Sequence, residues 1–150
     1  MAPGTTAGKQ ITQLLAQVPL FSGCTSSELE TIARAGKQVA HPDGEVIARE
    51  GESGYGLHVL LEGEARVEVK GEPRRILGPG QFFGELALLD KGPRTATVVA
   101  TSRLVTFVVP RWNFREILTS QPGLALKLLE EVAARFRSAT ATSPDDKLLD

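Results

Sequence analysis

The chain has 150 residues, of which 41% are hydrophobic and 23% charged, which suffices for one globular domain with a core but not for two. Seventeen Lys and Arg against 18 Asp and Glu give a net charge of -1, so no overall positive field attracts nucleic acid or anionic lipid. Cys24 is the single cysteine and His41 and His58 are the only histidines, which excludes an intrachain disulfide, a multi-thiolate zinc site and a three-histidine metal centre.

The two ends of the chain differ in composition from the middle. Residues 1–8 are mostly Gly, Ala, Pro and Thr and predict a disordered leader, and residues 140–150 predict a flexible tail. Neither an apolar run of about 18 residues nor a basic-then-apolar signal is recognised, so we expect a cytoplasmic protein without a membrane partner. One folded domain is therefore expected over residues 9–139.

Residues 9–36 predict two short helices. The first carries apolar residues at helical spacing and is closed by Pro19. The second begins with a Thr25 to Glu28 capping box and ends at Gly36. The apolar residues of the first helix are Ile11, Leu14, Leu15 and Val18.

Residues 37–110 predict strands and turns, because ten of the 15 glycines fall between Gly44 and Gly92 and separate runs too short for helices. Short strands at this close spacing are typical of a jelly roll or barrel. We expect strands at residues 45–49, 57–61, 64–70, 74–77, 95–101 and 103–109.

Residues 111–139 predict two further helices, a short one around Trp112, which we expect in the core, and a longer one from Pro122. The longer helix carries an apolar stripe from Leu124 to Phe136 that must be covered, either by the chain itself or by an effector protein or second copy. The order of helices, strands and helices indicates an α+β fold.

The densest chemical signal is the segment from Phe83 to Val98. Gly84 allows close approach of a ligand to the backbone, and the following turn presents free N–H groups, which attract an anion. Arg94 arrives from the next strand with a guanidinium that can clamp a phosphate. Glu85 is better suited to accept a hydrogen bond from a hydroxyl such as a ribose 2′-OH. One donor cluster and one acceptor predict a nucleotide site.

This segment resembles the phosphate-binding cassette of the cyclic-nucleotide-binding domain family, and the likeness extends over residues 11–136. Its further motifs are Pro42-x-Gly44, Gly51, Leu60-Leu61-x-Gly63-x-x-x-Val67 and Gly80-x-x-x-Gly84-Glu85. The resemblance implies an eight-stranded antiparallel β-roll, or jelly roll, flanked by short N-terminal helices and by C-terminal helices. It also implies a sensor that binds cyclic AMP or cyclic GMP as a ligand, needs no cofactor or metal, and catalyses nothing.

By position, the resemblance implies a ligand role for seven residues. Glu85 would hold the ribose 2′-hydroxyl, Arg94 would neutralise the cyclic phosphate, and the next two amides after Glu85 would complete the phosphate cradle. Thr95 would offer its hydroxyl to phosphate or base, and Val67 would line the base pocket. The full set is Gly84, Glu85, Leu86, Ala87, Arg94, Thr95 and Val67.

The chain departs from the family pattern at residues 54–56, Gly-Tyr-Gly, where many members carry an acidic residue. We assign this segment to a turn outside the cassette. The gene-regulator branch of the family continues into a helix-turn-helix of some 70 residues, and about a dozen residues follow the last helix here, so DNA binding is not expected.

Several alternatives stay open. A degenerate roll could keep the fold and act as an interaction or dimerisation module without ligand, and a metal-dependent jelly-roll enzyme would need more histidines than the chain has. Arg135 or Phe136 could cap the purine, or Phe136 could pack on the roll or on another chain. Arg74 and Arg75 are expected at a solvated strand edge. The base, cyclic AMP or cyclic GMP, is undecided.

Overall fold

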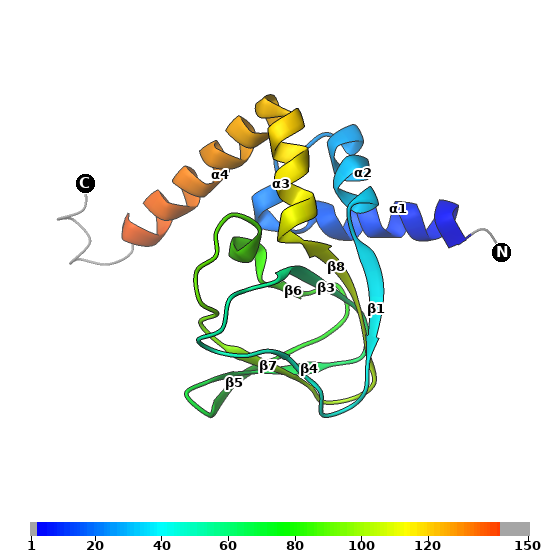
Figure 1. Ribbon diagram of the computed structural model, residues 1–150, viewed down its shortest axis with the longest axis vertical. Coiled ribbons are helices and arrows are strands. Elements are labelled where there is room, and N and C mark those ends of the chain that lie inside the picture. The colour runs from blue at the N-terminus through cyan, green and yellow to red at the C-terminus, as the bar shows by residue number, and fades with distance from the viewer. Residues whose placement is uncertain (1–2, 142–150) are drawn as a thin grey trace.

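A computed structural model describes residues 3–141 and shows a β-roll with a layer of helices over one end (Figure 1). Within these residues, eight strands form two four-stranded antiparallel sheets. The first sheet has the order β1 (Lys37–His41), β8 (Leu104–Pro110), β3 (Gly56–Glu62), β6 (Phe82–Phe83). The second has the order β2 (Val46–Ala48), β7 (Thr97–Ala100), β4 (Ala65–Val69), β5 (Glu72–Leu77). This arrangement confirms the predicted α+β fold with an eight-stranded roll.

The helices come from both ends of the chain and meet on the same side of the roll (Figure 1). They are α1 (Pro3–Ala16), the 3-10 turn η1 (Pro19–Phe21), α2 (Ser26–Arg34), α3 (Arg111–Ser120) and α4 (Pro122–Ala141). Helix α2 begins with the predicted capping box, in which the Glu28 amide donates to Thr25 Oγ1 and the Thr25 amide donates to Glu28 Oε1. A second 3-10 turn, η2 (Glu85–Leu88), lies between β6 and β7.

Two apolar clusters, one on each side of the first sheet, hold the structure together. Alternate residues of β3 divide between them, because successive side chains of a strand point to opposite faces. Leu57 and Val59 join the cluster beneath the helices, where Phe21 and Phe114 meet with ring centroids 5.8 Å apart. Leu60 joins the cluster inside the roll. The cluster beneath the helices buries residues of all four helices against β3 and β8, which fixes the helices on the roll.

A two-residue turn joins β4 to β5 and sets their register. Val69 pairs with Glu72 across it, and Lys70 and Gly71 have φ angles of 54° and 78°. Positive φ at both central positions is typical of the hairpin turn that matches the twist of the strands. Val67 consequently pairs with Arg75 on one side and with Val98 on the other.

The ends of the chain differ from the expected boundaries. Helix α1 begins at Pro3, so residues 3–8 are helical where a disordered leader was predicted. Proline fits the first turn of a helix, and extending a helix from an anchored turn costs little. Helix α4 likewise continues to Ala141, two residues into the predicted flexible tail. The remaining residues of these two predictions, 1–2 and 142–150, lie outside the described part of the chain.

Two strands were not predicted, β1 and β6. Strand β1 lies at the edge of its sheet and is mostly exposed, so its sequence carries no clear apolar alternation. Strand β6 has only two residues, and His58 and Val59 of β3 pair with them. Neither strand has the local pattern that identifies the others.

The prediction that Trp112 lies in the core is wrong. Its side chain is 51% exposed, because it points outward from the first turn of α3 and contacts the Tyr55 ring edge-on, with centroids 4.8 Å apart.

The apolar stripe of α4 is only partly covered. Leu124 and Leu128 are buried within the chain itself, whereas Phe136 is 59% exposed. The first half of the stripe is therefore not available to a partner.

Candidate functional site

The seven predicted ligand residues all border one cavity of about 460 Å³ between η2, the following loop and the second sheet. Arg75, Phe82, Phe83 and Asp90 also line it. The structure thus brings together Val67 of β4 and residues 84–95, which the sequence separates. Whether these residues bind a ligand stays a prediction.

Gly84 places η2 at the cavity wall. Its φ is 83°, a left-handed conformation that favours glycine, and it forms the N-terminal cap of η2. A Cβ at this position would come within 2.5 Å of Arg94 Nη1 and still closer to the Gly56 carbonyl oxygen. Glycine is therefore required both for the backbone turn and for the approach of the Arg94 side chain.

Glu85, the first residue of η2, has two carboxylate oxygens in different situations. Oε1 accepts a hydrogen bond from Arg135 Nη2 at 2.7 Å. Oε2 is buried and has no hydrogen-bond partner among the described residues. A buried carboxylate oxygen without a donor is unfavourable, so this atom is the natural acceptor for a ligand hydroxyl.

Arg94 enters the cavity from a rigid backbone. Its amide donates to Glu52 O at 2.7 Å and its carbonyl accepts from the Gly51 amide at 2.8 Å. The guanidinium contacts the Gly56 carbonyl at 3.5 Å but forms no ion pair with a carboxylate of the described residues. Partial burial lowers the pKa of Arg94 from its ordinary value. An anion bound beside this cation would compensate that loss of solvation.

A stacked pair of rings supports Arg94 from within the roll. The guanidinium carbon lies 5.7 Å from the centroid of the Phe83 ring, and His58 stacks on Phe83 with centroids 4.6 Å apart and planes 4° apart. His58 is buried, and neither ring nitrogen has a hydrogen-bond partner in the described structure. Burial, together with the charge of Arg94 and the nearby His41, lowers the pKa of His58 to about 3. His58 is therefore a neutral structural ring at ordinary pH.

The Gly54-Tyr55-Gly56 segment lies closer to the cassette than its assignment to a separate turn suggested. A Cβ on Gly54 would come 2.5 Å from Ala87 Cβ and 3.2 Å from Arg94 Nε. The segment is thus packed directly against η2 and the guanidinium. The segment carries no acidic side chain, and Arg94 has no carboxylate partner among the described residues.

The remaining predicted residues border the cavity in different ways. The Ala87 amide already donates to the Gly84 carbonyl at 3.1 Å, so it is not free to serve as a phosphate donor in this conformation. Val67 is buried and contributes an apolar wall, whereas Thr95 is exposed at the opening. Arg75, expected at a solvated edge, is exposed and also borders the cavity.

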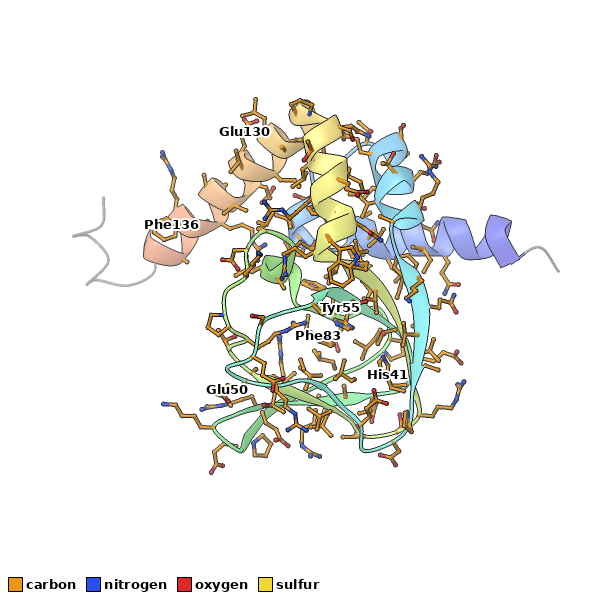
Figure 2. All side chains as sticks on the ribbon, in the orientation of Figure 1. His41, Glu50, Tyr55, Phe83, Glu130 and Phe136 are labelled. Atoms are coloured by element: carbon orange, nitrogen blue, oxygen red, sulfur yellow. The ribbon has the colours of Figure 1, made fainter. Side chains whose placement is uncertain are left out.

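Helix α4 ends beside the cassette. Figure 2 shows Phe136 near the far end of this helix, away from Phe83 inside the roll. Arg135, one residue earlier, contacts Glu85 rather than standing free to cap a base. Reasoning from the sequence did not predict this pair, because 50 residues separate its members.

Two absences hold for the described residues 3–141. They contain no group of three or more His, Cys, Asp or Glu side chains arranged to hold a metal ion. None of their helices combines the length and the apolar character needed to cross a membrane.

Comparison with known proteins identifies relatives of several kinds. Residues 38–121 match the family described as the cyclic nucleotide-binding domain. The chain is 35% identical over 125 residues to a putative potassium channel protein of Rhodopseudomonas palustris, covering 81% of this chain and 30% of the channel. It is also 35% identical over 130 residues to a cAMP-dependent protein kinase regulatory subunit of Emericella nidulans, covering 85% of this chain and 31% of that protein.

A solved structure shares the fold. The N-terminal domain of a transcriptional regulator from Streptomyces coelicolor superimposes with a TM-score of 0.77 at 27% identity, covering 84% of this chain and 94% of that domain. The chain spans about a third of the length of the channel relatives. The matched residues make up more than half of the chain and include the cavity wall from Val67 to Thr95. The chain therefore belongs to the cyclic nucleotide-binding domain family.

Proposed function

We propose that this domain is a sensor that binds a cyclic purine nucleotide, cyclic AMP or cyclic GMP, in the cavity beneath η2. One observation carries the proposal: among the described residues, a cation without a carboxylate partner and a carboxylate oxygen without a hydrogen-bond donor border the same cavity. Arg94 has no carboxylate partner and Glu85 Oε2 has no donor among the described residues. A cyclic nucleotide offers the complementary pair, a phosphate anion and a ribose hydroxyl.

The phosphate belongs at Arg94 and the ribose at Glu85. The guanidinium can donate two charge-assisted hydrogen bonds to one phosphate, and its backbone is already fixed, so little ordering is needed on binding. Val67 and the neighbouring apolar wall suit the purine, with Thr95 at the opening. In this arrangement the amide of Leu86 is the backbone donor to the phosphate, and the Ala87 amide joins it only after giving up its bond to Gly84.

The output of binding is a change in the position of helix α4, which then closes over the base. Ligand can shift this equilibrium only by binding the two helix positions with different affinity. The Arg135 to Glu85 contact supports this idea, because it joins α4 to a residue of the cavity. We also propose that the nucleotide is bound without chemical conversion, so incubation with either nucleotide should yield no 5′-monophosphate.

Calorimetric titration with both cyclic nucleotides tests the proposal. Arg94→Ala removes the only proposed side-chain cation facing the phosphate, and truncating one member of such a pair costs about 2–5 kcal/mol. Affinity should therefore fall about 30-fold or more. Arg66→Ala is a matched control, because Arg66 pairs with Glu68 at 2.6 Å and does not border the cavity.

Glu85→Ala tests the ribose position. A hydrogen bond to a charged group contributes about 1.5–3 kcal/mol, so the loss of affinity should be smaller than for Arg94→Ala. A 2′-deoxy cyclic nucleotide should bind the wild type more weakly than its parent but bind Glu85→Ala about as well as the parent does. Normal binding by Arg94→Ala, or no binding by the wild type at millimolar nucleotide, would contradict the proposal. The latter outcome would favour a roll that has kept the fold and lost the ligand.

A contact with an effector protein or a second copy stays a prediction. The exposed part of α4 that could provide it contains Leu126, Leu129 and Phe136, since Leu124 and Leu128 are buried within the chain. Sedimentation with and without nucleotide tests whether ligand changes the association state.

A further inference from the structure

The ion pair between helix α4 and the cavity has a feature that the proposed nucleotide site does not by itself require. Arg135 Nη2 donates to Glu85 Oε1 at 2.7 Å, and the two side chains are 40% and 12% exposed. The hydrogen bond to Glu85 raises the pKa of Arg135 above its ordinary value. Glu131, one turn earlier on α4, also faces Arg135, but its carboxylate accepts a hydrogen bond from Ser22 Oγ at 2.7 Å. Arg135 is therefore directed to Glu85.

The pair uses one oxygen of the carboxylate and leaves the other for a ligand. With Oε1 held by Arg135, the buried Oε2 is the atom without a partner, on a residue that borders the cavity. Rotation of the carboxyl group would break the contact with Arg135, so the contact fixes where Oε2 points. Fixing an acceptor before the ligand arrives reduces the ordering cost of binding.

The same contact also changes the electrostatics of the site. A carboxylate close to a bound phosphate repels it, because like charges disfavour each other at short distance. A guanidinium held at 2.7 Å compensates the charge of Glu85 while leaving its hydrogen-bonding capacity at Oε2. Glu85 can then serve the sugar without opposing the phosphate.

We propose that Arg135 is a positioning residue for the ribose site: it orients and neutralises Glu85, and thereby couples the end of α4 to the 2′-hydroxyl of the nucleotide. This inference rests on the proposed function. Arg135 and the hydroxyl occupy different oxygens of one carboxylate, so they support each other rather than compete. Because coupling between two sites is reciprocal, a ribose hydroxyl at Oε2 strengthens the attachment of α4 to the cassette.

The test compares each cyclic nucleotide with its 2′-deoxy analogue by calorimetry. The wild type should prefer the ribonucleotide by about tenfold or more, the value of a hydrogen bond to a charged acceptor. Arg135→Met removes the charge and the donors and keeps an apolar stem. It should lower this preference at least threefold, mainly by weakening the ribonucleotide, and Arg135→Lys should restore part of it. In a Glu85→Ala background, Arg135→Met should not change the preference.

Lys127→Met provides a matched control on the same helix. Lys127 donates to Glu28 Oε1 at 2.8 Å and is 37% exposed, so its replacement also removes one ion pair between α4 and the rest of the domain. It does not border the cavity, and the preference for the ribonucleotide should stay at the wild-type value.

The outcomes separate the two proposals. If Arg135→Met weakens the ribonucleotide and the 2′-deoxy nucleotide equally, Arg135 only stabilises the helix and the positioning role is wrong, although the nucleotide site stands. If Lys127→Met lowers the preference as much as Arg135→Met, the effect belongs to the helix as a whole and the role is again wrong. If the wild type binds neither nucleotide, both proposals fail together.

Discussion

The buried imidazole of His58 should make the stability of this domain depend on pH in a range where carboxylates contribute little. His58 is 5% exposed, without a hydrogen-bond partner among the described residues, and its pKa is lowered to about 3 by burial, by Arg94 and by His41. In the unfolded chain the pKa returns to about 6.5. Between these two values the unfolded state binds one proton more than the folded state, so protonation favours unfolding and stability falls as pH decreases.

The magnitude follows from the two pKa values. The free energy of unfolding should change by about 1.4 kcal/mol per pH unit below pH 6.5, and by about 2 kcal/mol in total between pH 7 and pH 5. Glu28, whose pKa is lowered by its bond to Lys127, adds to acid sensitivity only around and below its unfolded value of 4.5. The interval from pH 5 to pH 7 therefore isolates the histidines, of which the chain has two.

Urea unfolding measured by the fluorescence of Trp112, the only tryptophan, provides the assay. His58→Leu removes the titrating group. It should abolish most of the difference in the free energy of unfolding between pH 5 and pH 7, whatever its effect on stability at pH 7. His41→Gln is the control, because both ring nitrogens of His41 have hydrogen-bond partners, Glu45 at 3.1 Å and Thr106 at 3.2 Å. In this variant the pH dependence of the free energy of unfolding that comes from His58 should persist. An unchanged difference of about 2 kcal/mol in His58→Leu would refute the reasoning.

Four further substitutions, one of them a control, test the fold and the cavity. Gly84→Ala should displace the Arg94 guanidinium and thereby reduce nucleotide affinity, which calorimetry measures. Gly71→Ala is the control, because Gly71 has a φ of 78° and a Cβ there would meet no atom within 4 Å. It should lower the free energy of unfolding only by the backbone strain of about 1–2 kcal/mol and leave affinity unchanged. Thr25→Ala removes the capping box of α2 and should lower the free energy of unfolding by about 0.5–2 kcal/mol in urea. Phe114→Ala, in the cluster beneath the helices, should lower it by about 3–5 kcal/mol, and a loss below 1 kcal/mol would contradict the packing described.

The sequence allowed prediction of those parts of the fold that depend on local patterns. The strand predicted at residues 64–70, in which the apolar residues Ala65, Val67 and Val69 alternate with polar ones, contains β4. The capping box at Thr25 predicted the start of α2. Strand β6 has two residues and no period to detect, so only its pairing with β3 defines it. Helical spacing also does not say which side of α3 meets the core, which is why Trp112 was misplaced.

The candidate site likewise has one part that could be predicted from the sequence and another that could not. The residues from Gly84 to Thr95 lie close together in the sequence, and their chemistry could be recognised before their geometry was known. The contacts that complete the site come from distant segments: His58 stacks behind Phe83, and Arg135 reaches Glu85 from the last helix. No local pattern connects these positions, because the tertiary fold alone brings them together.

The first sheet separates the apolar residues of the helical layer from those of the roll interior, so the two clusters have no buried residue in common. Leu57 and Val59 pack under the helices, whereas Leu60, the next residue of the same strand, packs inside the roll. Loosening the helices therefore need not admit water to the interior of the roll, and the helical layer and the roll can open with different free energies. A substitution among the apolar residues beneath the helices therefore need not be matched by one among the apolar residues inside the roll.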